Sequence, residues 1–480
     1  MPHKKFIKDI GIIGIANMAM ALKGLLILPI ITKFLGAEKF GVWAQLVVVV
    51  SLITPITTLG LHYTLVRFLA AEKEKKEIQD GIYSVLFLVF IINLIAAIFL
   101  YLLAPYFSSI LDFDPVLVKM LSAIILLECL NLVFLNIFRA FQKIKRYAFF
   151  IIFQGFGEVF LVFLAVFFGY GLLGAVTSLL IIRIINFLIT GAIVLKEFGF
   201  VIPRFLRIKQ YLRFGIPTIP SNISSWFVHF IDRYLIGYFL GSLFVGYYVP
   251  AYILGSIIAF WEAPFSFLLP SALSKLYDEN KINEVKNYLK YSLKYFLMIA
   301  VPSLFGLSLL SKQLLNILST PEIANQGYLI VPFMATSMIF WGIYGIISQI
   351  IILVKKTSVL GKIWIIATII NLLLNILFIP KFGIMAAGAV TLLTYTVILV
   401  LSFYYSFKEL VFEIDWKSII KIIVSSVIMS ILLFWLNPIG LNKTLFAIIS
   451  GSALYAVILF LSKIFEEKEI FFFKNLLKLN

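Results

Sequence analysis

The sequence predicts an all-α polytopic membrane protein with about fourteen transmembrane helices. Of its 480 residues, 62% are hydrophobic and only 13% are charged, and the mean hydropathy is +1.07. The charged fraction is about half of that in a typical soluble domain. Apolar runs long enough to cross the hydrocarbon core of a bilayer recur along the whole chain. We therefore expect the chain to cross a membrane many times.

Each long apolar run is expected to form one membrane-spanning helix. The runs fall at 9–32, 41–65, 82–106, 116–138, 148–169, 172–195, 213–239, 243–270, 289–310, 325–353, 358–380, 383–407, 417–436 and 444–462. The first run follows a lysine-rich start, as in a secretion signal, but it is longer than the apolar core of a signal peptide. We therefore expect it to be retained as the first span.

Lysine and arginine alternate from one connection to the next. Of the forty Lys and Arg residues, thirty lie in the N-terminal segment, the even-numbered connections and the C-terminal tail, and five lie in the odd-numbered connections. The positive-inside rule then places both termini in the cytoplasm of a multi-pass protein of the cell membrane. The same pattern accounts for the net charge of +17, which argues against nucleic acid as a partner.

Two short motifs indicate an internal duplication. Phe34-Leu35-Gly36 with Gly41 returns 205 residues later as Phe239-Leu240-Gly241 with Gly246, and Tyr170-Gly171 returns as Phe382-Gly383. Six spans per repeat is an even number, so both halves point the same way and are related by a pseudo-two-fold axis along the membrane normal. We expect an N-terminal six-helix lobe at 1–200 and a C-terminal six-helix lobe at 201–410. Residues 411–480 then hold two additional helices and an amphipathic cytoplasmic tail.

The seventh span carries an unusual row of polar residues. Asn222, Ser225, His229, Asp232 and Arg233 follow one another at helical spacing, so they share one face over roughly 17 Å. Polar groups are costly in hydrocarbon, so this face is expected to border protein or a watery cavity. A polar cavity in a membrane protein is typical of a route for a transported molecule.

Other ionisable residues also fall within expected spans. They are Lys23, Glu128, Glu158, Arg183 and Glu262. One interpretation is a pathway for substrate and coupling ion. The other is structural ion pairing, with Glu158 against Arg183 and Asp232 neutralised by its neighbour. Lys23 lies roughly 21 Å from the inner end of its helix and has no acid on its own span. Glu262 comes two residues before Pro264, where a kink is expected that would serve as a hinge or as packing.

The sequence offers little for catalysis. The three histidines do not have the spacing of metal ligands, no glycine-rich nucleotide loop is present, and the single cysteine, Cys129, forms no internal disulfide. A membrane glycosyltransferase would need acidic residues on a substantial loop. The pair Asp112 and Asp114 lies on a short connection and is expected to cap a helix. We therefore expect no enzyme, no catalytic residue and no metal site.

Three segments resemble one family of membrane proteins. FGIPTIPSNISSWFVHFIDRYLIGYFLGSLFVGYYVPAY at 214–252 resembles the start of the second half in polysaccharide-export flippases. These are the Wzx-type O-antigen and repeat-unit translocases of the multidrug/oligosaccharidyl-lipid/polysaccharide exporter superfamily. LPIITKFLGAEKFGVWA at 28–44 and KFGIMAAGAVTLLTYTV at 381–397 are similar to further parts of these proteins. The most specific stretch is DRYLIG at 232–237, which is typical of the fold and says little about the substrate.

The resemblance implies a flippase for a polyprenyl-pyrophosphate-linked oligosaccharide or polysaccharide repeat unit. Such a protein moves its substrate from the cytoplasmic to the outer leaflet by alternating access of its two lobes. Basic residues in the cavity hold the pyrophosphate or acidic sugars, and the candidates here are Lys23, Arg183 and Arg233. Coupling to H⁺ or Na⁺ needs an acidic residue, and the candidates are Asp232, Glu158 and Glu128. No other cofactor is implied; membrane lipids and other glycan-assembly proteins are expected partners.

Two alternatives stay open. The expected spans hold four acids and three bases among the candidates, which would also suit a cation-coupled multidrug exporter of the same superfamily. A non-transporting scaffold for glycan assembly would use the basic loops and leave the buried charges inert. Replacing Lys23 or Arg233 separates these alternatives, because a scaffold should tolerate the change and a flippase should not. The glycan, the lipid carrier, the coupling ion and the oligomeric state stay open.

Overall fold

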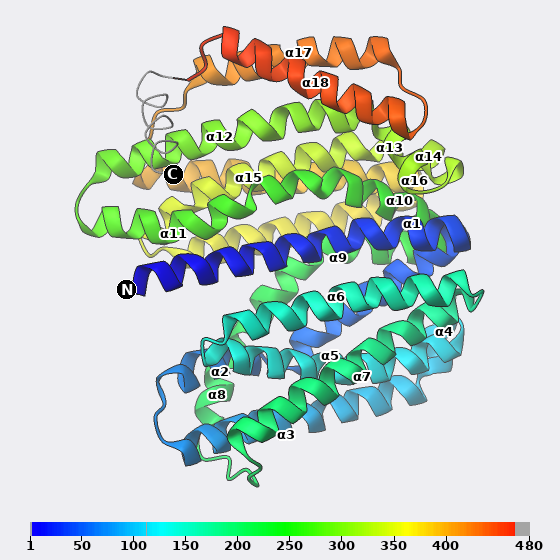
Figure 1. Ribbon diagram of the computed structural model, residues 1–480, viewed down its shortest axis with the longest axis vertical. Coiled ribbons are helices and arrows are strands. Elements are labelled where there is room, and N and C mark those ends of the chain that lie inside the picture. Colours follow the sequence, from blue (N-terminus) through cyan, green and yellow to red (C-terminus); the bar gives the residue numbers. More distant parts are fainter. Residues whose placement is uncertain (1, 112, 466–480) are drawn as a thin grey trace. The chain divides into compact units, whose positions relative to one another are not determined.

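The computed structural model describes residues 2–111 and 113–465, and every regular element within these ranges is a helix (Figure 1). Eleven of the helices are long and apolar enough to cross a membrane. Two of them, α1 (Pro2–Thr57) and α16 (Thr357–Glu409), leave helical geometry at Gly36 and Gly383. Dividing both helices there and adding α9 (Ile219–Leu240), which has 22 residues, gives the fourteen expected spans.

The chain forms two compact units. The first consists of Met1–Val249 and Trp364–Ala387, and the second of Pro250–Ile363 and Gly388–Asn480. The first unit holds α1, α2 (Leu61–Phe68), η1 (Leu69–Ala71), α3 (Lys75–Leu102), α4 (Ala104–Leu111), α5 (Pro115–Ala140), α6 (Ile144–Phe167), α7 (Gly171–Phe198), α8 (Ile208–Gly215), η2 (Ile216–Thr218), α9, the start of α10 (Ser242–Gly255) and part of α16. The second holds the rest of α10 and α16, η3 (Ser256–Trp261), α11 (Ala263–Asp278), α12 (Ile282–Leu309), α13 (Ser311–Leu318), α14 (Pro321–Gly327), α15 (Ile330–Leu353), α17 (Trp416–Leu436) and α18 (Leu441–Leu461). The lobe boundaries at 200 and 410 concern the duplication and stay a prediction.

The backbone repeats itself at the duplicated motifs. Gly36 and Gly241 both have positive φ, 82° and 92°, with extended ψ of 179° and 167°. Gly171 and Gly383 also share a positive φ, at 59° and 65°. L side chains rarely adopt this conformation, so glycine is required where the chain reverses between two spans. Gly36 and Gly241 therefore have nearly the same backbone conformation, and Gly171 and Gly383 share the sign and size of φ.

Two duplicated glycines contact each other's segments reciprocally. A Cβ on Gly41 would lie 1.8 Å from the carbonyl oxygen of Ser242, and a Cβ on Gly246 would lie 1.9 Å from that of Ala37. Gly246 is 205 residues after Gly41, and Ser242 is 205 residues after Ala37. Such a contact, in which each half presents the same surface to the other, is the mark of a two-fold axis. This supports the duplication inferred from the motifs.

The span Ser242–Asp278 changes geometry where the sequence predicts a kink. The short 3₁₀ helix η3 ends at Trp261, and α11 begins at Ala263. The proline thus occupies the first turn of α11, where its missing N–H would have had no partner in any case. Whether Glu262 and Pro264 act as a hinge stays a prediction.

Two smaller expectations concern helix ends. Asp114 caps α5, since its Oδ1 accepts the backbone N–H of Val116 at 2.8 Å. Its expected companion, Asp112, lies outside the described residues, as does most of the expected amphipathic tail, from 466 onward.

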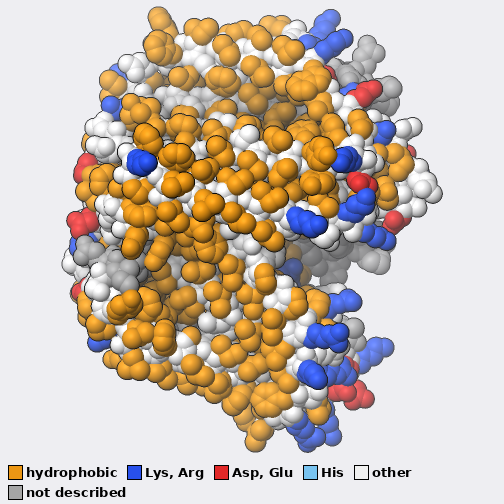
Figure 2. Space-filling model, turned by 180° about the vertical axis from the view of Figure 1, so that it is seen from behind, with side chains coloured by type: hydrophobic (Ala, Val, Ile, Leu, Met, Phe, Trp, Pro, Cys, Tyr) orange, Lys and Arg blue, Asp and Glu red, His pale blue; other side chains and the backbone are white. Residues whose placement is uncertain are grey.

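The outer surface of the helices is strongly apolar. Figure 2 shows hydrophobic side chains over most of the face that it presents. Phe434 and Trp435 at the end of α17 are 79% and 81% exposed, and many other large apolar side chains are exposed as well. In water such a surface would aggregate, whereas lipid accommodates it.

Candidate functional site

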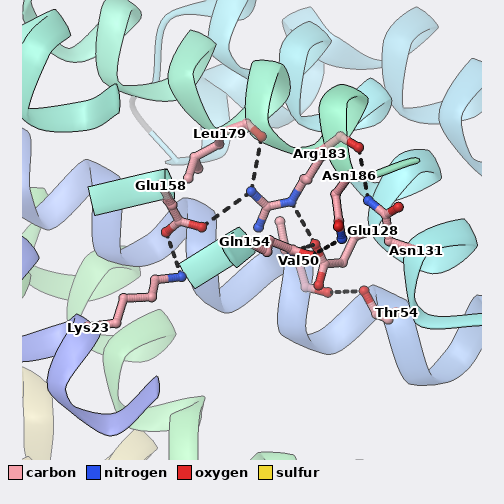
Figure 3. A network of polar contacts seen from close by, with 10 residues as sticks. All are labelled: Lys23, Val50, Thr54, Glu128, Asn131, Gln154, Glu158, Leu179, Arg183 and Asn186. Atoms are coloured by element: carbon pink, nitrogen blue, oxygen red, sulfur yellow. Dashed lines mark hydrogen bonds and ion pairs between the residues drawn. The ribbon is translucent and has the colours of Figure 1, made fainter. Parts of the chain in front are cut away.

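Four ionisable side chains meet inside the first unit (Figure 3). The ammonium Nζ of Lys23 lies 2.6 Å from Oε1 of Glu158. Nε of Arg183 lies 2.7 Å from Oε2 of Glu128, and its Nη1 lies 3.5 Å from Oε2 of Glu158. The four residues come from α1, α6, α7 and α5, respectively. Two bases and two acids leave this buried charge network electrically balanced.

Amides on the same helices complete the network. Gln154 donates to Oε2 of Glu128 at 3.1 Å, and Asn186 donates to Oε1 of Gln154 at 2.8 Å. Asn131 donates to the carbonyl oxygen of Arg183 at 3.0 Å. Gln154 precedes Glu158 by four residues, and Asn186 follows Arg183 by three, so each amide shares a helical face with a charge. The polar faces of α5, α6 and α7 are thus joined by hydrogen bonds.

The network settles which charges are neighbours. Glu158 and Arg183 pair across α6 and α7, as the structural interpretation of the sequence supposed. Lys23, which has no acid on its own span, takes its partner from α6. The pair of Arg183 with Glu128 was not foreseen, because the sequence does not say which spans are adjacent. Removing one partner of a buried ion pair leaves a charge uncompensated, so the loss of any one member of the network is expected to destabilise the packing of its helices.

The first half of the polar row on α9 borders a cavity. Asn222, Ser225 and His229 line a space of about 450 Å³ within the first unit. Its other described wall residues are Ser51, Thr54, Pro55, His62, Tyr63, Leu132, Trp226 and Phe230. None of these wall residues is Lys, Arg, Asp or Glu. We call this space the uncharged cavity.

Asp232 and Arg233 are not among the residues that line the uncharged cavity. Asp232 is 2% exposed, and its carboxylate accepts the backbone N–H of Arg233 at 2.7 Å and the hydroxyl of Tyr248. The guanidinium carbon of Arg233 lies 4.9 Å from the centre of the Phe230 ring, in the range of a cation–π contact. The two charges are thus held within the protein around α9.

A second cavity, of about 880 Å³, adjoins the first. Its described lining consists of Tyr63, Val66, Arg67, Ala70, Arg139, Phe214, Pro217, Thr218 and Asn222. Tyr63 and Asn222 line both spaces, so the two cavities share a wall. We call the second space the arginine cavity.

The arginine cavity carries positive charge without acidic neighbours in its described lining. Arg67 lies near the end of α2 and Arg139 in the last turn of α5, and both side chains are exposed. Neither guanidinium takes part in a salt bridge to another described residue. Sequence reasoning counted both only as markers of topology. Their position at the very ends of two spans, rather than in mid-connection, was the available signal.

Glu262 belongs to the second unit. It is 7% exposed and stands just before the first residue of α11. A Cβ on Gly345 of α15 would lie 2.5 Å from its Oε1, so the glycine leaves room for this carboxylate. The structure therefore packs Glu262 against α15.

Among the residues that the structure describes, no group of three or more His, Cys, Asp or Glu side chains is arranged to hold a metal ion.

Comparison with known families gives the identity of the chain. Residues 6–267, more than half of the sequence, match the family described as polysaccharide biosynthesis protein. The chain belongs to this family. Residues 217–377 also match the MatE family. The resemblance read from the sequence is thereby confirmed.

Curated relatives of this family member come from the archaeon Haloferax volcanii. The "Probable low-salt glycan biosynthesis flippase Agl15" is 25% identical over 282 residues, which are 58% of this chain and 59% of that protein. The "Probable flippase AglR" is 25% identical over 301 residues, which are 58% and 62%. The chain thus spans about three fifths of the length of these relatives.

Solved structures establish the fold. The lipid II flippase MurJ in an inward closed conformation superposes with a TM-score of 0.75 at 18% identity, over 98% of this chain and 100% of that one. An inward-facing multidrug resistance MATE family transporter of the MOP superfamily gives 0.64 at 16%, over 82% and 97%. The predicted all-α polytopic fold is confirmed, and the chain is a multi-pass membrane protein. These relatives and neighbours are named as flippases and transporters, in agreement with the prediction that the chain is not an enzyme.

Proposed function

We propose that the protein is a flippase that moves a polyprenyl-pyrophosphate-linked oligosaccharide from the cytoplasmic to the outer leaflet of the cell membrane by alternating access. The observation that carries the proposal is the arginine cavity with its adjoining uncharged cavity. Together they offer a cationic site for a diphosphate beside a polar, uncharged space for a glycan. Family membership and the names of the Haloferax relatives support it.

Arg67 and Arg139 suit a pyrophosphate. The guanidinium group is planar, always charged, and presents a fork of N–H donors that matches phosphate oxygens. No described lining residue of the arginine cavity is acidic, so an anion there would meet no opposing charge. Both arginines belong to connections that the positive-inside rule assigns to the cytoplasm, together with both termini. The substrate would therefore enter from the leaflet in which lipid-linked glycans are assembled.

The resemblance implied that Lys23, Arg183 and Arg233 bind the pyrophosphate; that prediction is untested, and our proposal gives this role to other residues. The ion pairs with Glu158 and Glu128 already compensate Lys23 and Arg183. We therefore assign the capture of the anion to Arg67 and Arg139, and the stabilisation of the helices to the buried charge network.

The coupling ion is proposed to act on the acidic residues Glu128, Glu158 and Asp232 of the first unit. Glu128 and Glu158 share Arg183, so a proton or a Na⁺ ion on either carboxylate would change the balance of charge on the guanidinium. Asp232 is the third candidate, buried beside Tyr248. A rearrangement of α5, α6 and α7 in response would couple ion binding to the shape of the first unit.

A multidrug exporter is the second candidate, because the MatE match covers residues 217–377. An exporter of organic cations favours acidic groups around its substrate. Neither of the two cavities has an acidic residue among its described lining. This observation favours an anionic substrate over a cationic one.

The test is leaflet translocation in vesicles that contain only the purified protein. A fluorescent polyprenyl-pyrophosphate disaccharide is followed by a membrane-impermeant quencher, with imposed H⁺ or Na⁺ gradients. We expect translocation well above that of protein-free vesicles and no transport of a lipophilic cation such as tetraphenylphosphonium. Cation transport without glycolipid translocation would support a drug exporter instead of a flippase. The absence of both activities under every gradient would support the scaffold.

A further inference from the structure

The wall of the uncharged cavity combines aromatic rings with neutral polar groups. Tyr63, Trp226 and Phe230 supply the rings. Hydroxyl, amide and imidazole groups come from Ser51, Thr54, His62, Asn222, Ser225 and His229. The volume of about 450 Å³ lies within the range of about 300–1,000 Å³ that is usual for small-molecule sites. The cavity is therefore large enough for a small ligand group, and the side chains of its wall determine which kind of group can bind there.

Several wall groups are held in fixed orientations. Nε1 of Trp226 donates to Oγ of Ser51 at 2.9 Å, which fixes the plane of the indole ring. Nδ1 of His229 donates to the carbonyl oxygen of Ser225 at 2.7 Å, and its ring stacks on Trp364 at a centroid distance of 5.9 Å. A preorganised wall loses little freedom when a ligand binds.

His62 adds an unmet hydrogen-bonding group. Its side chain lines the cavity, the residue is 6% exposed, and its Nδ1 has no hydrogen-bond partner among the described residues. Buried polar groups nearly always have partners, so such a group at a cavity wall indicates a ligand or a bound water. A hydroxyl both donates and accepts, so it can satisfy the imidazole in either tautomer.

Sugars match this combination. One face of a pyranose ring presents C–H groups that pack on aromatic rings, and its edge presents hydroxyls. We propose that the uncharged cavity binds the sugar residues attached directly to the pyrophosphate, and that it selects uncharged sugars over uronic acids. The inference rests on the proposed function, because it requires the diphosphate to occupy the adjoining arginine cavity.

The selectivity follows from the absence of charge in the described lining. A uronic acid would bring a carboxylate into a space whose described wall holds no Lys or Arg. Burying a carboxylate without a partner is costly. The bases of the buried charge network, Lys23 and Arg183, are already paired with acids. Arg67 and Arg139 would be engaged by the pyrophosphate.

The experiment measures equilibrium binding to the purified full-length protein. Three short-chain polyprenyl-pyrophosphate probes are compared: one without sugar, one with a disaccharide that begins with N-acetylglucosamine, and one with a disaccharide that begins with glucuronic acid. We expect the neutral disaccharide to bind at least tenfold more tightly than either of the others. In Ser225→Lys, which places a cation on the wall, the acidic disaccharide should gain at least tenfold over the neutral one. The sugar-free probe should keep its wild-type affinity and thus report correct folding.

The outcomes separate this inference from the proposed function. Equal binding of the neutral disaccharide and the sugar-free probe, or of the neutral and acidic disaccharides, would overturn the sugar site and leave the flippase standing. If the wild-type protein binds none of the three probes, the proposed function falls, and the inference falls with it.

Discussion

Arg183 holds the centre of the buried charge network. It reaches Glu128 on α5 and Glu158 on α6, while Lys23 on α1 reaches Glu158 from another side. Ion pairs thus connect four helices of the first unit, and each charged residue has its partner on another helix. Removal of one partner leaves a charge exposed to a poorly solvating interior, which typically costs about 3–5 kcal/mol for a fully buried pair.

We expect Lys23→Met to lower the melting temperature of the purified protein, since Glu158 loses its closest counter-charge. The double variant Lys23→Met with Glu158→Gln should recover part of the loss, because the carboxylate goes with the lysine. The lysine side chain is 22% exposed, so the loss should fall below that of a fully buried pair. Thermal unfolding in detergent measures this. Lys33→Met, an exposed position on the same helix α1, is the control, and an equal melting temperature for the two single variants would contradict the account.

The sequence indicated the residues of the network but not their partners. Charges within apolar runs are visible without a structure, so Lys23, Glu128, Glu158 and Arg183 were all found. Their pairing depends on which helices are neighbours, and hydrophobic periodicity does not carry that information. Arg67 and Arg139 were missed for a related reason: a basic residue at a span end looks the same whether it faces water or a cavity.

At the scale of elements, the duplicated glycines allow two segments of the first unit to touch through their backbones. Alanine at Gly41 would place a methyl group 1.8 Å from the carbonyl oxygen of Ser242, and backbone cannot move aside as a flexible side chain can. We expect Gly41→Ala and Gly246→Ala to separate the two segments.

The measurement is maleimide labelling of Gln45→Cys in a Cys129→Ser background. Gln45 is 2% exposed and donates to Oγ of Ser242, so its replacement reports on this contact. Labelling should be slow with the native glycines and several-fold faster with either alanine. Gly14→Ala on the same helix, where a Cβ meets nothing within 4 Å, should leave the rate unchanged. Slow labelling in all variants would show that the two segments stay together without the close contact at these glycines.

The connection between α7 and α8 is fastened to the start of α3. The carboxylate of Asp80 accepts the backbone N–H groups of Arg204 and Leu206, the latter at 3.1 Å. Arg207 forms salt bridges with Glu72, at 2.7 Å, and with Glu77. Exposed pairs of this kind contribute little to global stability, so their effect should be local.

A pH dependence of this connection follows from Glu72. The backbone N–H groups of Glu74 and Lys73, followed by the side chains of Glu77 and Arg207, lower the pKa of Glu72 from 4.5 to about 2. A lowered pKa means that the folded state favours the ionised carboxylate. Its contribution is present above the unfolded value and is lost as the pH falls through about 2.

We therefore expect pepsin to cut within 199–207 slowly at pH 4 and faster as the pH approaches 2. Cleavage within 436–441 serves as the reference for the activity of the protease itself. Glu72→Gln should already be cut rapidly at pH 4. Equal normalised rates for this variant and the wild type at pH 4 would show that Glu72 does not hold the connection.

At the scale of the whole molecule, the sequence predicted the number of spans well because two independent physical patterns agree. The length of each apolar run matches the thickness of the bilayer, and the alternation of Lys and Arg between connections predicts the orientation of each span. The irregular position before α11 was visible in the sequence through Pro264, whereas the turn that separates α1 from α2 was not predicted. That turn contains Gly60, which has a positive φ of 64°. Glycine and proline alone do not mark the end of a span, because Pro29 and Pro55 lie inside α1.

The orientation itself is open to a direct test. In a Cys129→Ser background, Lys73→Cys should be labelled by an impermeant maleimide only after the membrane is opened, and Lys443→Cys should be labelled in intact cells. Both side chains are exposed, so access to the reagent depends on the side of the membrane. Labelling of Lys73→Cys in intact cells would reverse the assigned topology.

The most direct test of the account compares glycolipid translocation by matched charge variants. Arg67→Ala with Arg139→Ala removes the positive charge of the arginine cavity. Lys73→Ala with Lys145→Ala removes the same charge from exposed positions nearby that do not line it. We expect the arginine variant to lose at least tenfold in the initial rate of polyprenyl-pyrophosphate disaccharide translocation, with an unchanged melting temperature, and the lysine variant to keep the wild-type rate. An equal rate for both variants would contradict the claim that this cavity receives the pyrophosphate.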